Sequence, residues 1–197
     1  MNTFCLVMVG LVVSVGVGAQ RPTLRDDVKR ESGPIEKQVR SLPEPQSVKS
    51  LLAVSDLVVR VIVGPPLTSY LTVDGTDVRT DYRLQVTEVL PSLKPPTVPF
   101  QADANGHLTL TQRGGTVVID GHSATVRHKA LAPLTPGTQA LMFLVRVGDK
   151  YEIAMDYYGV FAVHGETVVP VTPHVFDEHH QRGLSLGEFR DEVANTR

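Results

Sequence analysis

Hydrophobic and polar residues alternate along much of the chain as they do in β-strands. The clearest case is residues 78–90, where Val78, Tyr82 and Leu84 alternate with charged and polar side chains. This period of two predicts a strand with one face buried and the other in water. Residues 140–145 (ALMFLV) are apolar on both faces, which is typical of a strand enclosed by the rest of the fold.

Tight turns separate the β-rich runs. Pairs of glycine with a polar neighbour occur at 74–75, 105–106, 120–121, 148–149 and 164–165. Such pairs tolerate the positive φ that hairpin turns require. Another β-branched run, 56–63, stops at Gly64-Pro65-Pro66, which predicts the end of a strand. Short strands with few helices predict an all-β domain over residues 47–173, a small closed or partly open barrel of the OB type.

A helix is predicted on each side of this β domain. Residues 47–54 (SVKSLLAV) form a short helix before the first long strand. At the other end, Ser185 stands three residues before Glu188, which is the spacing of a capping box. We therefore expect a C-terminal helix over residues 186–194 that packs on the barrel through Phe189.

The N-terminus has the pattern of a signal peptide. Residues 4–19 carry no charge and end in Val17-Gly18-Ala19, a small-residue cleavage sequence. The run is shorter than the roughly 20 apolar residues of a membrane helix. We expect a signal peptide over 1–19, cleaved near Ala19, and an extracytoplasmic protein, periplasmic or secreted, with no transmembrane span after cleavage. The residues before the apolar run include no Lys or Arg, so a retained anchor is the alternative.

The two segments that flank the β domain are polar. Residues 20–46 are dense in charge and contain four prolines, and they have too few apolar residues to fold alone. They are predicted to be a flexible polar tether. Residues 174–197 are predicted to be a linker followed by the C-terminal helix.

Composition excludes several functions. The chain has 19 basic and 21 acidic residues and a net charge of −2, without the basic excess that nucleic-acid binders show. The single cysteine, Cys5, lies in the predicted signal peptide. The mature chain is therefore predicted to have no disulfide, no thiolate nucleophile and no sulfur-ligated zinc. No cofactor is predicted.

The densest group of histidines is in the segment PHVFDEHH. It contains His174, His179 and His180 together with Asp177 and Glu178, and these residue types can hold a metal ion. Zinc sites on helices favour histidine pairs four residues apart, and this segment has no such pair. The favoured interpretation is a polar linker, and a metal site is the alternative.

Two more histidines, His122 and His128, are predicted to lie on the same face of one strand. Six residues of strand place them roughly 20 Å apart, which is too far for one metal ion. They are expected at opposite rims of the barrel.

Three patterns suggest catalysis but lack what that chemistry needs. Glu88 is in phase with a buried strand face, yet the alternation breaks just after it, so a bulge or strand end is expected to turn it to solvent. Ser185 lies in a G-x-S-x-G pattern, but no histidine follows it, and a helix cap explains it better. Arg113-Gly114-Gly115 is too short for a phosphate-binding loop and precedes a strand. No catalytic residue is predicted.

Asp156-Tyr157-Tyr158 lies next to Gly159 between two predicted strands. Exposed tyrosines on a loop are suited to contact a peptide or a sugar. Asp156, Tyr157 and Tyr158 are therefore the candidate binding residues. The alternative is that one tyrosine packs inward and the other shields the end of the barrel.

Several short motifs follow one another along the β domain. They are SDLVVR at 55–60, TDYRLQVTEVL at 80–90, RGG at 113–115, PG at 136–137, LMFL at 141–144 and GVF at 159–161. This pattern resembles a group of exported bacterial proteins of unassigned function. The resemblance implies a five-stranded OB-type barrel, distantly similar to the tissue inhibitors of metalloproteinases and the netrin-like module. Those relatives act through an N-terminal cysteine in a disulfide, which this chain lacks, so the resemblance implies a fold and no inhibitory activity.

Together these observations favour a non-enzymatic, exported β-barrel domain that binds a protein, peptide or glycan in the cell envelope. The first alternative is a metal-binding protein or hydrolase that uses the segment His174 to His180. The second is a structural spacer of the envelope. The sequence predicts no particular oligomeric state.

Overall fold

The computed structural model describes residues 23–28, 34–37, 45, 47–93, 102–128, 133–172 and 176–196. The fold is mostly β, with about 50% strand and 21% helix, so the predicted all-β class with a helix on each side is confirmed. The predicted signal peptide, 1–19, lies outside the described residues. No described helix is both long enough and apolar enough to cross a membrane.

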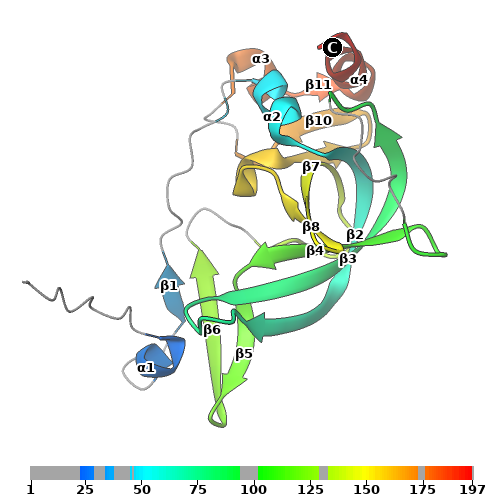
Figure 1. Ribbon diagram of the computed structural model, residues 1–197. Coiled ribbons are helices and arrows are strands. Elements are labelled where there is room, and N and C mark those ends of the chain that lie inside the picture. The colour runs from blue at the N-terminus through cyan, green and yellow to red at the C-terminus, as the bar shows by residue number, and fades with distance from the viewer. Residues whose placement is uncertain are drawn as a thin grey trace, which may run out of the picture.

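Five strands of the large sheet pair into a closed ring (Figure 1). They are β2 (Leu57–Leu71), β3 (Val78–Leu90), β4 (His107–Arg113), β7 (Gln139–Val147) and β8 (Lys150–Ile153). β2 pairs with β3 and β7, and β3 pairs with β4. β8 closes the ring, because it pairs with β7 along its length and with β4 at one position, Leu110 opposite Tyr151. The ring encloses apolar side chains of all five strands, among them Val61, Leu84 and Met142.

Three further strands extend the sheet beyond β7. They are β9 (Val160–His164), β10 (Thr167–Pro170) and β11 (Leu184–Ser185). Their outer face and that of β7 are covered by α2 (Val48–Val54) and α4 (Leu186–Asn195), at the top of Figure 1. This second core centres on Phe143, Phe161 and Phe189, each at most 1% exposed.

Capping residues at their N-termini explain where α2 and α4 begin. The side chain of Ser47 caps α2 by accepting a hydrogen bond from the backbone N–H of Ser50. Ser185 and Glu188 form the complete capping box of α4. The predicted helix and its cap are confirmed, and Ser185 is engaged in this structural role.

A smaller sheet lies beside the ring, at the lower left of Figure 1. It has the order β1 (Ile35–Lys37), β6 (His122–His128), β5 (Gly115–Ile119) and is accompanied by α1 (Leu24–Val28). A flexible tether was predicted over 20–46, and this prediction is wrong for α1 and β1, because Leu24 and Ile35 are buried against Val126 and its neighbours. A few apolar side chains suffice once a sheet face is available to receive them.

The strand β2 does not end at Gly64-Pro65-Pro66 but runs on to Leu71, so this predicted end was wrong. Its pairing with β3 shifts register between Val63 and Pro66, and such an irregularity accommodates proline within a strand. Gly64 is required there, since a Cβ atom would lie 2.5 Å from the backbone oxygen of Arg83.

The strand predicted at 78–90 is confirmed as β3. Near its end, Arg60 is opposite Glu88 and Val61 is opposite Val86, so Thr87 is an extra residue that forms a bulge. The bulge leaves Glu88 partly exposed, as expected, where its carboxylate accepts hydrogen bonds of 2.8 and 2.6 Å from Arg190 of α4. Glu88 thus fastens the C-terminal helix to the sheet.

Candidate functional site

The two candidate tyrosines lie in η1 (Asp156–Gly159), a short 3-10 helix between β8 and β9. Tyr158 is buried in the second core, and its hydroxyl accepts a 2.8 Å hydrogen bond from that of Tyr157. The pair is therefore not an exposed contact surface, and the alternative with one tyrosine packed inward describes the structure. Asp156 is partly exposed and has a positive φ of 56°. This left-handed conformation is uncommon for residues other than glycine, and such strained residues are often found at functional sites.

Tyr157 lines a cavity of about 730 Å³, which we call the apolar compartment. Its apolar lining residues include Val63, Leu134, Ile153, Val160 and Ala162, and its polar ones, besides Tyr157, include Gln112, Thr138, Gln139 and His164. The compartment lies where β4 and β8 separate: these strands pair only at Leu110 and Tyr151, and both Gln112 and Ile153, two residues further along, face the cavity. It therefore adjoins the interior of the ring.

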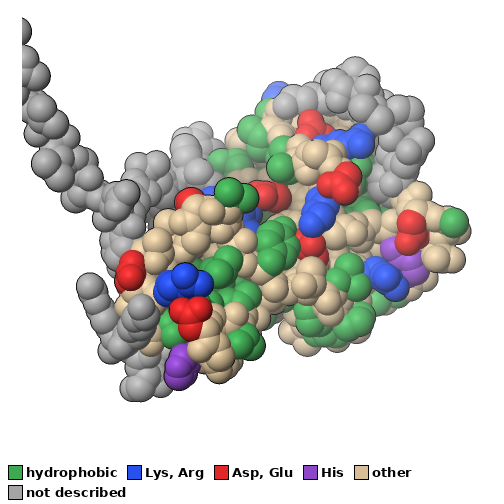
Figure 2. All heavy atoms as spheres, turned by 60° about the horizontal axis from the view of Figure 1, so that its bottom comes forward, with side chains coloured by type: hydrophobic (Ala, Val, Ile, Leu, Met, Phe, Trp, Pro, Cys, Tyr) green, Lys and Arg blue, Asp and Glu red, His purple; other side chains and the backbone are tan. Residues whose placement is uncertain are grey.

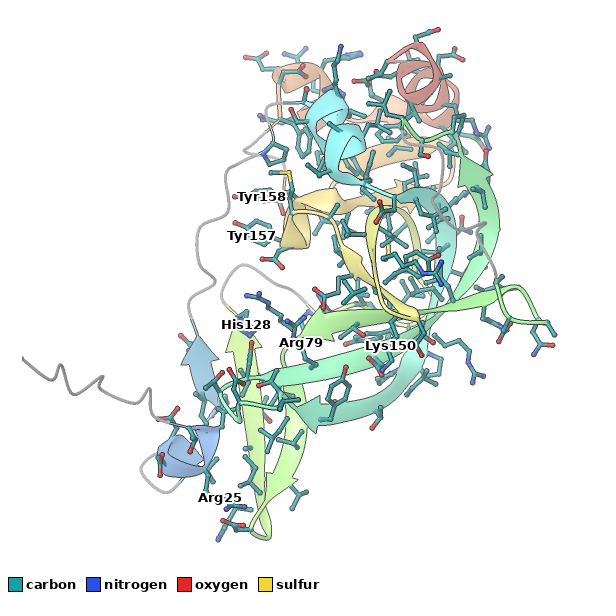
Figure 3. All side chains as sticks on the ribbon, viewed as in Figure 1. Arg25, Arg79, His128, Lys150, Tyr157 and Tyr158 are labelled. Atoms are coloured by element: carbon teal, nitrogen blue, oxygen red, sulfur yellow. The ribbon has the colours of Figure 1, made fainter. Side chains whose placement is uncertain are left out.

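A second cavity, of about 810 Å³, lies beside the first, and we call it the basic compartment. Its lining includes Glu36, Tyr82, Arg113, Arg127, His128 and Pro133. Pro133 lines both compartments, and Gln112 and Arg113 are neighbours on β4. Figure 3 shows Tyr157 on η1 and His128 at the end of β6 on the same side of the molecule. The two compartments together form the candidate site.

Arg113 carries an unsatisfied group in the basic compartment. Its Nε atom is buried and has no hydrogen-bond partner. Among the described carboxylates, none forms an ion pair with Arg113. Since an arginine is always charged in a protein, a buried N–H of its guanidinium without a partner is costly.

His128 is the second unsatisfied group. Its side chain is only 4% exposed, and Nε2 lies 3.0 Å from Oδ1 of Asp77. The same oxygen accepts a 2.9 Å hydrogen bond from the backbone N–H of Val78, so Asp77 holds the imidazole in one orientation. The other ring nitrogen, Nδ1, is buried without a partner.

His122 and His128 were predicted at opposite rims of the barrel. This prediction is wrong, because β6 belongs to the smaller sheet and not to the ring. His122 is exposed at the hairpin between β5 and β6, whereas His128 is buried at the other end of the strand. They lie at opposite ends of β6, as the strand geometry requires.

Another buried charged group outside the compartments has its partners. Asp81 of β3 accepts hydrogen bonds of 2.7 Å from Lys150 and 2.7 Å from Thr111. The bond to Asp81 raises the pKa of Lys150 above its ordinary value. This satisfied cluster stabilises the junction of β3, β4 and β8, in contrast to Arg113 and His128. On the face in Figure 2, acidic and basic side chains likewise lie next to one another.

The predicted metal candidates do not converge on one ion among the described residues. His174 lies outside these residues, and His179 is exposed on α3 (Glu178–Arg182). His180 is buried between two carboxylates, with Nδ1 2.7 Å from Asp177 and Nε2 2.9 Å from Glu192. Both of its ring nitrogens are engaged, so His180 links α3 to α4.

This link makes part of the stability dependent on pH. Burial lowers the pKa of His180, but the hydrogen bonds to Asp177 and Glu192 and their charges outweigh it and raise the pKa above 6.5. Because the folded-state value is the higher one, this stabilisation is complete below about pH 6.5 and is lost as the pH rises through the folded-state value. The pKa of Asp177 is lowered below 3.8 by hydrogen bonds from the backbone and side chain of His180, so its contribution is lost only at more acidic pH.

We therefore expect His180→Asn to reduce the free energy of unfolding at pH 5.5 by about 1–2 kcal/mol, and by less at pH 9. Urea unfolding of both proteins at the two pH values measures this difference. The matched control is His179→Asn, an exposed neighbour on the same helix, which should change stability at neither pH. An equal loss at pH 5.5 and pH 9 in His180→Asn would contradict the charged link.

The sequence does not assign Arg113 or His128 to this site. Arg113 precedes two glycines that are too few for a phosphate-binding loop, and His128 is too far along its strand from His122 to share a metal ion. Their common feature, a buried polar atom without a partner, depends on which strands meet in space. The nearest signal in the sequence is Gly114-Gly115, where the chain passes from β4 to β5.

Comparison with known proteins identifies no relative: no family model matches the chain, no curated protein matches it, and no solved structure matches it. The geometry of the two compartments is therefore the basis on which a function can be proposed.

Proposed function

We propose that this protein is an exported, non-enzymatic binding domain that holds a peptide segment of an envelope protein in the apolar compartment. The observation that carries the proposal is the compartment itself, which is about 730 Å³ in volume, is lined in part by Tyr157 and adjoins the ring interior. Cavities of roughly 300–1,000 Å³ with apolar walls and a few polar groups are the usual form of a ligand site.

The lining favours a peptide. Apolar side chains such as Leu134, Ile153 and Val160 suit the apolar side chains of a ligand. Gln112 and Gln139 also line the compartment. Oε1 of Gln139 accepts a 2.8 Å hydrogen bond from Arg60, and the NH2 group of the same side chain is of the kind that donates to a peptide C=O group. Tyr157 adds an amphipathic ring to the lining.

The alternatives lack comparable support. A metal-dependent or hydrolytic function at His174 to His180 would need His180, whose two ring nitrogens already bind Asp177 and Glu192. The OB-type barrel and the similarity to the tissue inhibitors of metalloproteinases and the netrin-like module stay predictions. A structural spacer without a ligand is one outcome of the following test.

The test is a variant in which a larger side chain occupies the compartment. Ala162 lies on β9, is partly exposed and lines the compartment, while its neighbour Phe161 is buried in the second core. Ala162→Phe should therefore place a phenyl ring in the cavity. We expect heptapeptides selected from a phage-displayed random library on the wild-type protein to bind Ala162→Phe at least tenfold more weakly, because the space they need is occupied. Calorimetric or fluorescence titration of synthetic peptides measures the affinity.

The matched control is Ala194→Phe, which adds the same ring at an exposed position of α4 and should bind the peptides as the wild type does. Thermal unfolding confirms that both variants are folded. Equal binding by Ala162→Phe would remove the compartment from the proposal. Failure to select any peptide, or binding of soluble glycans alone, would overturn the proposed function.

A further inference from the structure

We propose that Arg113 and His128 form a carboxylate-binding subsite in the basic compartment. The inference deepens the proposed function and rests on it for the identity of the ligand, since it assigns to the bound peptide a carboxylate group next to its apolar part. The subsite itself is argued from the two unsatisfied side chains and from the charges around them.

Arg113 supplies a directed positive charge. Its buried Nε–H has no partner within the protein, and an oxygen of an anion placed in the compartment would accept that hydrogen bond. Charge-assisted hydrogen bonds from arginine to a carboxylate are stronger than neutral ones and fix its orientation. A bound carboxylate thus removes the cost of leaving this donor unpaired.

His128 supplies the second contact. Asp77 holds Nε2, so Nδ1 is the ring nitrogen left for a ligand, and His128 is only 6% exposed overall. A carboxyl group satisfies Nδ1 in either protonation arrangement. As a carboxylate it accepts the N–H of a charged ring, and as the acid it donates its O–H to a neutral ring, so one proton lies between the two groups in both cases.

The balance of charge favours an anion with a single charge. Among the described residues that line the compartment, Arg113 and Arg127 are positive and Glu36 is negative. Asp77, which contacts His128, adds another negative charge. Two carboxylates this close to the subsite oppose a doubly charged phosphate more than a carboxylate.

The turn from β4 to β5 keeps the subsite open. Gly114 and Gly115 line the compartment with positive φ values of 92° and 130°. A Cβ atom on Gly114 would lie 3.0 Å from the backbone oxygen of Val126 and 3.6 Å from the ring of His128. The absence of a side chain at Gly114 allows this turn to approach Val126 of β6 closely, and Arg113 and His128 line one cavity beside it.

The first experiment uses acetate as the probe. Amide chemical shifts of the ¹⁵N-labelled protein are followed during titration with sodium acetate at constant ionic strength. We expect the amides of Gly114, Gly115 and His128 to shift, and Arg113→Gln to weaken this binding about tenfold. Arg113→Lys keeps the charge but not the Nε–H, so a smaller loss is expected there. Arg83→Gln is the matched control, because Arg83 is exposed on β3 and lines neither compartment.

Peptide probes then identify the source of the carboxylate. The acid form of N-acetyl-Val-Val-Val carries a C-terminal carboxylate, its amide carries none, and the amide of N-acetyl-Asp-Val-Val carries one on a side chain. We expect the acid or the aspartyl peptide to bind wild-type protein about tenfold more tightly than the uncharged amide. In Arg113→Gln this preference should fall to about one.

The outcomes separate this inference from the proposed function. Acetate binding that persists in Ala162→Phe, while peptides no longer bind, supports both. Acetate binding without any peptide binding supports the subsite and overturns the proposed function. Three results would overturn the subsite, whatever the peptides do. The first is that acetate shifts none of the amides of Gly114, Gly115 and His128, and the second is that both Arg113 variants bind acetate as the wild type does. The third is that inorganic phosphate binds more tightly than acetate.

Discussion

Phe161→Ala is expected to lower the free energy of unfolding by about 3–5 kcal/mol, as large-to-small changes in well-packed cores do. Phe161 is 1% exposed and lies at the centre of an aromatic cluster. Its ring centroid is 5.7 Å from that of Phe143, 5.2 Å from Phe176 and 5.0 Å from Phe189. Removal of this ring leaves a cavity between β9 and α4 that its neighbours cannot fill.

Urea unfolding measures the effect, and Val118→Ala is the control. Val118 is 73% exposed on β5, so its truncation should change the free energy of unfolding by no more than about 0.5 kcal/mol. A loss below about 1 kcal/mol in Phe161→Ala would show that α4 does not depend on this core.

Gly115→Ala should destabilise the protein by about 3 kcal/mol or more, because a strained backbone and a steric collision add together. Gly115 has φ of 130°, and a Cβ atom there would overlap the hydroxyl of Thr80. That hydroxyl is fixed by a 2.7 Å hydrogen bond to the backbone oxygen of Gly114 and a 2.8 Å bond to Ser69. It therefore cannot move aside without loss of both bonds.

The matched control is Gly121→Ala in the hairpin between β5 and β6. Gly121 has φ of 83°, and a Cβ atom would meet nothing within 4 Å, so only the backbone strain of about 1 kcal/mol remains. Thermal and urea unfolding of the two variants give the difference due to the collision. If both variants lose the same free energy, the start of β5 does not approach Thr80 of β3 as closely as described.

The parts of the fold that the sequence predicted well are those fixed by neighbouring residues. The alternation over 78–90 gives β3 with its bounds, and Ser185 with Glu188 gives the start of α4. The glycine turns at 120–121 and 164–165 lie in hairpins. In each case the determining contacts lie within a few residues of one another, so the local pattern contains the information.

The parts that were missed depend on contacts between distant segments. The strand β1 exists because Ile35 pairs in parallel with Val126, and nothing in the polar sequence around Ile35 indicates that partner. The passage of β2 through Gly64-Pro65-Pro66 depends on β3 accommodating the register shift. A local rule for strand ends could not anticipate either pairing.

The residues of the candidate site likewise divide into those that a local pattern indicates and those that depend on contacts between distant segments. The sequence singled out Tyr157 and Tyr158 as aromatic residues next to a glycine, and the structure places only Tyr157 at a cavity. Arg113 and His128 belong to different sheets and are brought together by the turn at Gly114-Gly115. Whether a polar atom is buried without a partner is a property of the assembled fold, and no spacing in the sequence expresses it.

A crystal structure of the protein with a peptide selected on it tests the proposal that the two compartments bind the ligand. We expect the peptide's apolar side chain to lie against Ile153, Tyr157 and Ala162, and its carboxylate to lie at Arg113. A peptide seated elsewhere, with both compartments empty, would contradict it.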